Sequence, residues 1–240
     1  SDAALQSAQN LIYDAFEKDD PADRVAIAKE ALAISPNCAD AWVLLAEEAE
    51  SLSEASRLYE QGVEAGRRAI GKEFDSHVGH FWGVLPTRPY MRARTGLADC
   101  LWGSGRRDEA IEHYLDMLRL NPNDNQGLRY ILAPRLLESG RAAEAEQLLN
   151  RFDDCTAQWL FNKSLLAFRK EGDTGAARKL VANANEANPY VPKYLTGQRM
   201  VPVYRPDSYS LGSDEEAQIY AGEASAAWKS TPGAVAWLRK

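Results

Sequence analysis

The stretch Leu97-Ala-Asp-Cys-Leu-Trp-Gly-Ser-Gly-Arg-Arg-Asp-Glu-Ala-Ile-Glu-His-Tyr-Leu-Asp-Met-Leu-Arg-Leu-Asn-Pro122 decides the fold. Apolar and small residues recur at spacings of three and four on both sides of Gly105, which is the pattern of two amphipathic helices joined by a turn. Pro122 lacks a backbone N–H and disfavours helix in the residue before it, so the second helix ends near Asn121. The stretch therefore predicts a helix–turn–helix hairpin.

The same order of residue types recurs along the chain. A near copy contains Ser164-Leu165, Phe168, Gly172, Ala177, Val181, Ala184 and Pro189, and a degenerate copy contains Leu132-Ala133, Leu136, Gly140, Ala145 and Leu149. Two looser copies precede them, one around Leu45-Ala46 and Tyr59, and one from Leu11 to Pro36. These offsets resemble the tetratricopeptide repeat, a helix–turn–helix unit with a period of about 34 residues.

The fold class follows from this repeat. Small residues at fixed positions let the two helices of a unit approach closely, and bulky residues fill the space around their crossing. The composition agrees, because Ala and Leu number 63 against 17 for Val and Ile, a surplus of helix formers over residues typical of strands. We expect an all-α, right-handed superhelix of about five helical hairpins with a C-terminal capping helix.

Two segments depart from the period and set the expected domain boundaries. We expect a repeat array over residues 1–195 with an irregular insert at about 66–90, then a Pro-containing extended loop over residues 196–212. Residues 213–240 then form the capping helix on the same domain, opened by the capping box Ser213-Asp-Glu-Glu216. The loop is long enough to fold back over a groove of the array.

Several of these irregular segments carry a more specific resemblance. The stretches are Pro36-Asn-Cys-Ala39, Leu44-Leu-Ala-Glu-Glu-Ala49, Glu54-Ala-Ser-Arg-Leu-Tyr59, Val78-Gly-His-Phe81, Asn188-Pro-Tyr-Val-Pro-Lys-Tyr-Leu195 and Ser213-Asp-Glu-Glu-Ala217. In this order they are similar to the suppressor of tumorigenicity seven family of helical-repeat proteins. The resemblance implies the repeat fold, and it implies no catalytic residues.

Charge and cysteine usage narrow the class of protein and its compartment. The net charge of −7 argues against a nucleic-acid partner, which requires a basic footprint. No apolar run approaches the roughly 20 residues of a membrane span, and no secretory signal is present at Ser1. That first residue leaves open whether an upstream segment precedes it. The three widely spaced cysteines form neither a disulfide framework nor a zinc motif, so we expect a cytoplasmic protein without membrane contact.

The candidate site is a partner-binding groove. In stacked hairpins the first helices line a concave surface, where arginine, asparagine and aromatic side chains can bind a peptide or a partner helix. The residues predicted to face it are Arg92, Thr95, Asp99, Trp102, Arg129, Tyr130, Trp159, Asn162 and Arg169. The alternative is that the aromatics belong to the core and the arginines are solvated.

A basic belt is a second candidate surface. Residues 1–64 carry a net charge of −10 and residues 65–94 a net charge of +4, counted from the sequence. The belt consists of Arg67, Arg68, Lys72, Arg88, Arg92 and Arg94. It can receive an acidic partner or the chain's own acidic end, within one molecule or by self-association, or it can simply be a solvated face.

The function we predict is a non-catalytic adaptor or scaffold for a protein or peptide partner, with no cofactor and no metal. The alternative is an enzyme, or a small-molecule or metal-binding protein, with its site in the irregular region from His77 to Tyr90. A pocket that brings together His77, His80, Asp75 and Arg88 would favour this alternative. Aromatic side chains buried in the insert, with the histidines hydrogen-bonded to backbone, would favour the scaffold.

Overall fold

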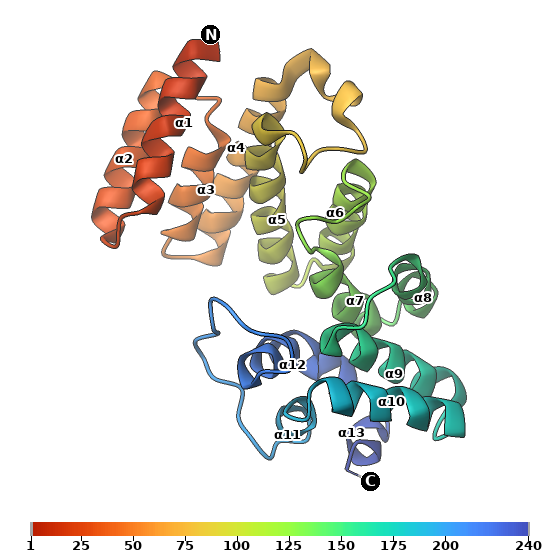
Figure 1. Cartoon of the computed structure of the whole chain (residues 1–240). Helices are drawn as coiled ribbons and strands as arrows, with labels where there is room; N and C mark the ends of the chain where they lie inside the picture. Colours follow the sequence, from red (N-terminus) through yellow and green to blue (C-terminus); the bar gives the residue numbers. More distant parts are fainter. Residues whose placement is uncertain (1, 240) are drawn as a thin grey trace. The chain divides into compact units, whose positions relative to one another are not determined.

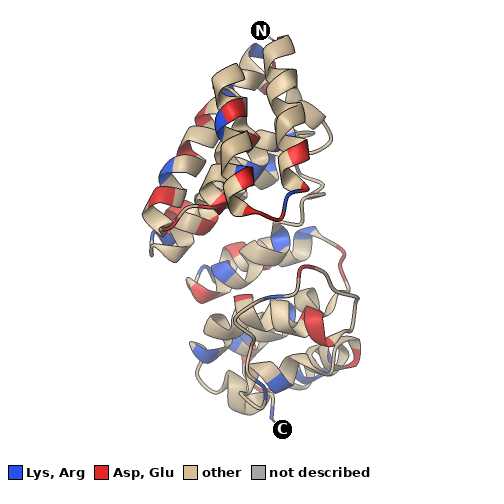
Figure 2. Ribbon diagram, turned by 90° about the vertical axis from the view of Figure 1, so that its left-hand side faces the viewer, with Lys and Arg blue, Asp and Glu red and all other residues tan. Residues whose placement is uncertain are grey.

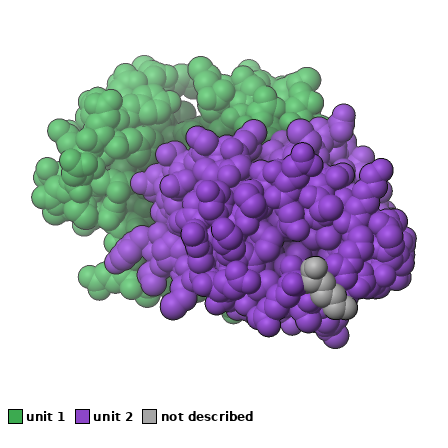
Figure 3. Space-filling view, turned by 60° about the horizontal axis from the view of Figure 1, so that its bottom comes forward, with its two compact units in different colours: residues 1–126 green, residues 127–240 purple. Residues whose placement is uncertain are grey.

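The computed structural model describes residues 2–239 as helices joined by turns and loops, with no strand in that range. The chain divides into two compact units, unit 1 with residues 1–126 and unit 2 with residues 127–240. Figure 3 colours the two units separately. Each unit contains helical hairpins that follow one another along the chain (Figure 1). The all-α helical-repeat fold predicted from the sequence is therefore confirmed.

Unit 1 contains three hairpins. Their helices are α1 (Asp2–Phe16) with α2 (Pro21–Ile34), α3 (Ala39–Glu47) with α4 (Leu52–Ile70), and α5 (Arg88–Gly103) with α6 (Arg107–Leu120). We call the first helix of each hairpin the A helix and the second the B helix. A helices pack on their neighbours as well as on their own B helices, since α3 contacts both α4 and α5.

Local sequence explains where these helices begin and end. The Asp20 side chain accepts a hydrogen bond from Ala22 N and caps α2, and the Ser51 hydroxyl accepts one from Glu54 N and caps α4, as N-cap residues do. The α5–α6 turn contains Gly105 with φ +83°, a conformation that residues with a Cβ rarely adopt. α6 ends at Leu120, with Asn121 as its C-cap and Pro122 next in the chain, where the sequence predicted the end.

The insert between α4 and α5 is held by aromatic packing. It consists of three short 3₁₀ turns, Gly71–Glu73, Asp75–His77 and Leu85–Thr87. Phe74 and Phe81 are buried, with ring centroids 4.8 Å apart, and both rings contact Tyr90 of α5. The amides of Gly79 and Phe81 donate to the carbonyl of Leu120 at the end of α6. The insert thereby covers one end of the third hairpin.

Unit 2 contains two further hairpins and three additional helices. The hairpins are α7 (Arg129–Glu138) with α8 (Ala142–Arg151), and α9 (Ala157–Glu171) with α10 (Gly175–Ala187). The additional helices are α11 (Val191–Leu195), α12 (Asp214–Lys229) and α13 (Ala234–Trp237). Residues 198–213 between α11 and α12 form neither helix nor strand.

Helix α12 begins at the capping box that the sequence predicted. The Ser213 hydroxyl accepts a hydrogen bond from Glu216 N at 3.2 Å, and the buried Glu216 carboxylate accepts from Gly212 N at 2.7 Å. The helix packs on α7, α9 and α11. It therefore covers the A-helix face of unit 2 rather than only the end of the last hairpin (Figure 1).

Candidate partner-binding site

The residues predicted to face the groove all lie on A helices, but they divide between the two units. Arg92, Thr95, Asp99 and Trp102 lie on α5 in unit 1. Unit 2 holds the others, on two helices: Arg129 and Tyr130 on α7, and Trp159, Asn162 and Arg169 on α9. We therefore describe two A-helix faces, one for each unit.

Arg92 is fixed by a buried carboxylate in unit 1. Asp40 of α3 is fully buried, and its Oδ1 accepts a hydrogen bond from Arg92 Nε at 2.8 Å while its Oδ2 accepts from Arg92 Nη2. Gln9 of α1 donates its Nε2 to the same carboxylate at 2.8 Å. A buried carboxylate requires such partners, because removing its charge from water is costly. The three A helices of unit 1 are thus joined by one polar cluster, which we call the Asp40 cluster.

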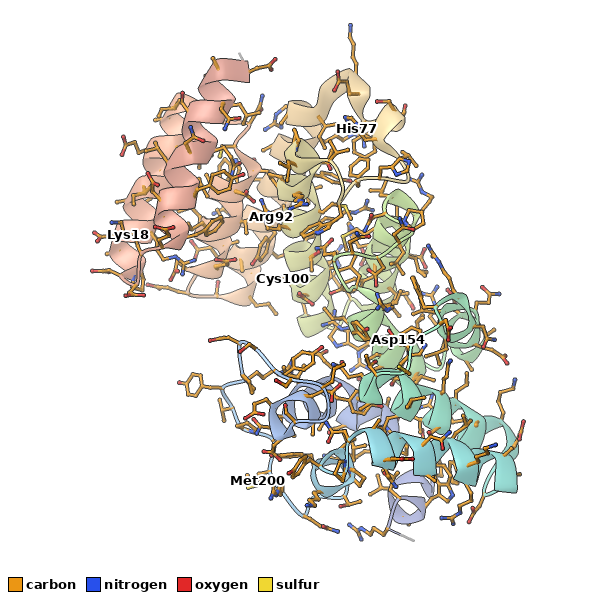
Figure 4. All side chains as sticks on the ribbon, in the orientation of Figure 1. Lys18, His77, Arg92, Cys100, Asp154 and Met200 are labelled. Carbon is orange, nitrogen blue, oxygen red and sulfur yellow. The ribbon has the colours of Figure 1, made fainter. Side chains whose placement is uncertain are left out.

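The guanidinium of Arg92 is only partly used by this cluster. Its side chain is 31% exposed, and Nη1 has donors left to point at solvent or a partner. Burial favours the neutral form, but the hydrogen bonds and charge of Asp40 outweigh it, and nearby Tyr13 and Glu47 add to them. The pKa of Arg92 therefore lies above its ordinary value. Figure 4 labels Arg92 on α5, on the side that faces α3. Tyr13 of α1, whose ring is 52% exposed, lies close enough to interact electrostatically with Arg92.

The other three predicted groove residues of α5 are bound within unit 1. Thr95 donates its hydroxyl to Met91 O at 2.9 Å and accepts from Gln126 Nε2 at 2.8 Å. Asp99 accepts a hydrogen bond from the Tyr114 hydroxyl at 2.6 Å. The guanidinium of Arg107 lies 4.9 Å from the centroid of the Trp102 ring. All three side chains are partly exposed.

In unit 2, Arg129 and Tyr130 bind Asp154 in the loop before α9. The Tyr130 hydroxyl donates to Asp154 Oδ2 at 2.6 Å, and Arg129 Nη2 donates to the same oxygen at 3.0 Å. Burial and this hydrogen bond raise the pKa of Tyr130 to about 12. The fully buried Trp159 packs its ring edge to face on Tyr130 and Phe152. Figure 4 labels Asp154.

Asn162 and Arg169 contact the chain's own helix α12. Asn162 is fully buried, and its Oδ1 accepts a hydrogen bond from the Tyr220 hydroxyl at 3.0 Å. Arg169 donates its Nε to the Thr231 hydroxyl at 2.7 Å and its Nη2 to Ala227 O at 2.9 Å. Burial lowers the pKa of Arg169. These two residues line an A-helix face, and that face already holds a helix.

Five of the six residues of the basic belt contact other residues of unit 1. Arg67 lies over the Phe74 ring at 4.3 Å, Arg68 Nε donates to Asn37, and Arg88 Nε donates to Trp82 O. Arg92 binds Asp40, and Arg94 binds Asp116 at 2.5 Å. Asp40 belongs to the acidic first quarter of the chain, so part of the belt meets that quarter within unit 1. Figure 2 shows acidic residues around the α1–α2 turn.

The two histidines of the insert lie in different surroundings. His77 Nε2 lies 3.5 Å from Glu73 Oε2, and His80 is exposed. Across residues 2–239 there is no group of three His, Cys, Asp or Glu side chains that can hold a metal ion. Phe74 and Phe81 are buried, as expected for the scaffold, whereas the His77 side chain contacts the Glu73 carboxylate.

Sequence reasoning missed Asp40 and Asp154, which bind the predicted Arg92 and Arg129, and Gln9, which binds Asp40. The sequence offered little indication of these contacts, because a single acidic residue one hairpin away from an arginine matches no short motif. It also missed Tyr13, whose exposure follows from the position of α1 at the start of the array. The buried Asp40 was detectable only as a charged residue in the otherwise apolar segment Ala39–Ala46.

The fold and the two A-helix faces define a helical-repeat protein of the tetratricopeptide class. A structure titled "Crystal structure of YrrB: a TPR protein with an unusual peptide-binding site" is similar to the chain, with a TM-score of 0.52 at 18% identity. The match covers 74% of this chain and 81% of YrrB. At this identity the similarity extends to the fold alone.

A family model described as "ST7 protein" matches residues 1–240, so the chain belongs to that family. The suppressor of tumorigenicity 7 protein-like of Rattus norvegicus is 29% identical over 98% of this chain and 46% of its own length. The suppressor of tumorigenicity 7 protein of Macaca fascicularis is 27% identical over 96% of this chain and 52% of its own length. The chain thus spans about half the length of these relatives.

The predicted family is confirmed by these matches. Within the described part of the chain, no helix has the length and apolar character needed to cross a bilayer.

Proposed function

We propose that this chain is a non-catalytic interaction scaffold that binds a partner's helix or extended peptide on its A-helix faces. The observation that carries the proposal is the contact between α12 and α9 in unit 2. There an asparagine, an arginine and an aromatic ring of the A helix bind another helix through Tyr220, Ala227 and Trp228. Asparagine, arginine and aromatic residues are the types that the repeat pattern placed in the groove.

The A-helix face of unit 1 presents the chemistry for a partner carboxylate or carbonyl group. Arg92 is held in one orientation by Asp40, so little side-chain entropy is lost when it binds a further acceptor. The exposed ring of Tyr13 adds an aromatic surface of the kind enriched at binding hot spots. A C-terminal or acidic peptide segment matches this pair. The similar fold of YrrB, which is described as a TPR protein with an unusual peptide-binding site, supports this proposal.

The test is affinity capture from native lysate followed by mass spectrometry, with Tyr13→Glu as the variant. This change removes the exposed ring and places a carboxylate where it can occupy the open donor of Arg92. Leu85→Glu is the matched control, since Leu85 is 65% exposed in the insert of the same unit. We expect Tyr13→Glu to reduce the recovery of specific partners at least about tenfold, as expected for a hot spot, while Leu85→Glu retains them.

The choice of position matters in this experiment. Substituting Arg92 would leave the buried Asp40 carboxylate without its ion-pair partner, and substituting Tyr130 would remove one hydrogen bond from Asp154; either change would destabilise its unit. Tyr13 avoids this problem because its ring is exposed. Identical sets of captured proteins from the wild type, Tyr13→Glu and Leu85→Glu would contradict the proposed face.

A further inference from the structure

Helix α12 occupies the A-helix face of unit 2 as a ligand would. It packs on α7, α9 and α11, whereas its described contacts with the B helices α8 and α10 are minor. Its buried residues are Glu216, Ala217, Tyr220, Ala221, Ala224, Ala227 and Trp228. α12 is thus a helix seated along one face of the hairpins, and residues 198–213, which are neither helix nor strand, connect it to α11.

Two aromatic side chains anchor α12. Tyr220 and Trp228 are eight residues apart, which places them on the same side of a helix. The Phe161 ring of α9 stacks on Tyr220 with centroids 5.8 Å apart and meets Trp228 edge to face at 6.4 Å. Trp228 Nε1 donates to the Tyr220 hydroxyl at 3.0 Å, and this hydroxyl donates to Asn162. One hydrogen-bonded chain therefore connects both anchors to the face.

Charged residues fix the direction of the helix on this face. Arg135 of α7 lies 3.7 Å from Glu223, and Arg169 of α9 donates to Ala227 O near the end of α12. A guanidinium is well placed at the C-terminal end of a helix, where carbonyl groups lack partners. The face therefore fits a helix with an aromatic residue, as at Tyr220, and an acidic residue three positions later, as at Glu223. Small residues lie at the fourth and seventh positions after the first aromatic residue, and a second aromatic residue lies at the eighth.

The fit between α12 and this face is incomplete. The side-chain nitrogen Nδ2 of Asn162 is buried beside α12 without a hydrogen-bond partner, and unpaired buried donors are costly. Apart from Tyr220 and Trp228, the apolar residues that α12 buries are alanines, each of which removes little apolar area from water. A helix that keeps the small residues and places an acceptor opposite Asn162 would therefore bind the same face more tightly.

The segment that connects α11 to α12 is exposed over part of its length. Met200, Val203 and Tyr204 are each more than 90% exposed, so few contacts hold this part of the chain, and Figure 4 labels Met200 on this segment. The segment contacts α12 through the ion pairs of Arg199 with Asp214 and of Arg205 with Glu223, and through the capping contacts of Gly212 and Ser213 with Glu216.

We propose that α12 is a resident ligand of the A-helix face of unit 2 and that a partner's helix with the pattern of Tyr220, Glu223, Ala224, Ala227 and Trp228 displaces it. This inference rests on the proposed scaffold function and names the partner that unit 2 accepts. The partner presents an amphipathic helix with two aromatic anchors and an acidic residue between them. Binding of this helix and docking of α12 exclude one another, so the free chain is held in a closed state.

The experiment uses the full chain and a labelled synthetic peptide of residues 213–231 as the probe, with binding followed by fluorescence anisotropy. Trp228→Ala weakens the docking of α12 and should raise the affinity for the peptide at least about tenfold over the wild type, by removing the internal competitor. Trp237→Ala is the matched control, because Trp237 is also buried in unit 2 but packs on Phe168 and Asp173. A peptide that carries Tyr220→Ala and Trp228→Ala should bind none of the chains.

A second variant guards against misfolding of Trp228→Ala. Glu223→Arg replaces the attraction to Arg135 by repulsion without removing a core side chain, and it should also raise peptide affinity. Circular dichroism checks that each variant keeps its helix content. Peptide binding to both variants that is no tighter than to Trp237→Ala would overturn the proposal. So would a wild-type dimer that depends on concentration and is lost in Trp228→Ala, because a second copy would then be the occupant. Neither result bears on Tyr13 in unit 1, so failure here is distinguishable from failure of the scaffold function.

Discussion

At the scale of single residues, the protonation of His113 depends on its contacts within the α5–α6 hairpin. Its Nδ1 accepts a hydrogen bond from Arg94 Nε at 3.1 Å, which requires that this nitrogen carry no proton. Burial, and then the charge of Arg94, lower the pKa of His113, while Asp116 and Glu109 oppose the shift. The folded chain therefore holds this imidazole in its neutral form at a pH where the unfolded chain protonates it.

We predict that this residue makes unit 1 less stable in mild acid. Because the folded pKa lies below the ordinary value of about 6.5, the stability is complete above that value and is lost as the pH falls from 6.5 toward the folded pKa. The slope is at most about 1.4 kcal/mol per pH unit for one proton. Urea unfolding of the wild type and of His113→Gln between about pH 5 and pH 7.5 measures the difference.

Two comparisons make this pH measurement specific. His113→Gln keeps an acceptor for Arg94 and should unfold with a shallower pH dependence, while His80→Gln, at an exposed histidine, should follow the wild type. The prediction is wrong if His113→Gln and the wild type lose stability in parallel over this range.

For single residues, the sequence predicted the helix on which a candidate residue lies but not the residue that it binds. The repeat spacing placed Arg92, Asn162 and Arg169 on A helices, where the structure has them. It could not show that Asp40 holds Arg92 or that Tyr220 holds Asn162, because these pairs are 52 and 58 residues apart in the chain. Contacts at this separation depend on how hairpins stack, and no local pattern encodes that. Their role in binding a partner stays a prediction.

At the scale of elements, two glycines allow α4 and α5 to pack closely. A Cβ on Gly66 would lie 2.9 Å from the Cα of Tyr90, and one on Gly62 would lie 3.0 Å from the Cβ of Ala93. The first contact is with backbone, which cannot rotate away. The close approach of the two helices therefore depends on the missing side chain at Gly66.

We predict that Gly66→Ala destabilises the chain by about 1–3 kcal/mol, the usual cost of overpacking a core. Gly175→Ala in the first turn of α10 is the matched control, because a Cβ there meets nothing within 4 Å. That control should be neutral or stabilising by up to about 1 kcal/mol. Urea midpoints of the two variants give the comparison, and equal shifts would show that α4 and α5 can separate at no cost.

Helix ends were more predictable than the segments between hairpins. Pro122, Pro189 and Ser213 mark boundaries that the structure has within a residue or two, since each acts through its own backbone or cap. The 3₁₀ turns of the insert follow no repeating sequence pattern from which they could be predicted. They are held by Phe74, Phe81 and the carbonyl of Leu120, contacts that form only once the third hairpin exists.

At the scale of the whole molecule, the sequence showed that a last helix exists but not which surface it covers. The spacing of Tyr220, Ala224, Ala227 and Trp228 defines an apolar stripe. Such a stripe can pack against any exposed apolar face of the hairpins. The choice of the A-helix face depends on Arg135, Asn162 and Arg169, which meet specific polar groups of α12 and the turn after it. These contacts fix the place of the helix within unit 2.

The same contacts predict how the chain behaves when its connecting segment is cut. Tyr204 is 91% exposed, so limited chymotrypsin should cleave after it and yield fragments 1–204 and 205–240. The shorter fragment keeps α12, whose anchors Tyr220 and Trp228 remain buried against α9. We expect both fragments to elute together from a sizing column under native conditions and to separate in denaturant.

The Trp228→Ala chain supplies the contrast for this cleavage. Loss of a buried tryptophan costs about 3–5 kcal/mol. In the cut chain α12 is no longer covalently connected to α11, so this cost weakens the binding of one fragment to the other. The fragment 205–240 should then dissociate, while cut Trp237→Ala retains it, because Trp237 packs on Phe168 rather than on Phe161. Release of the fragment from the cut wild type in native buffer would mean that the covalent connection, and not the face of α7 and α9, keeps α12 in place.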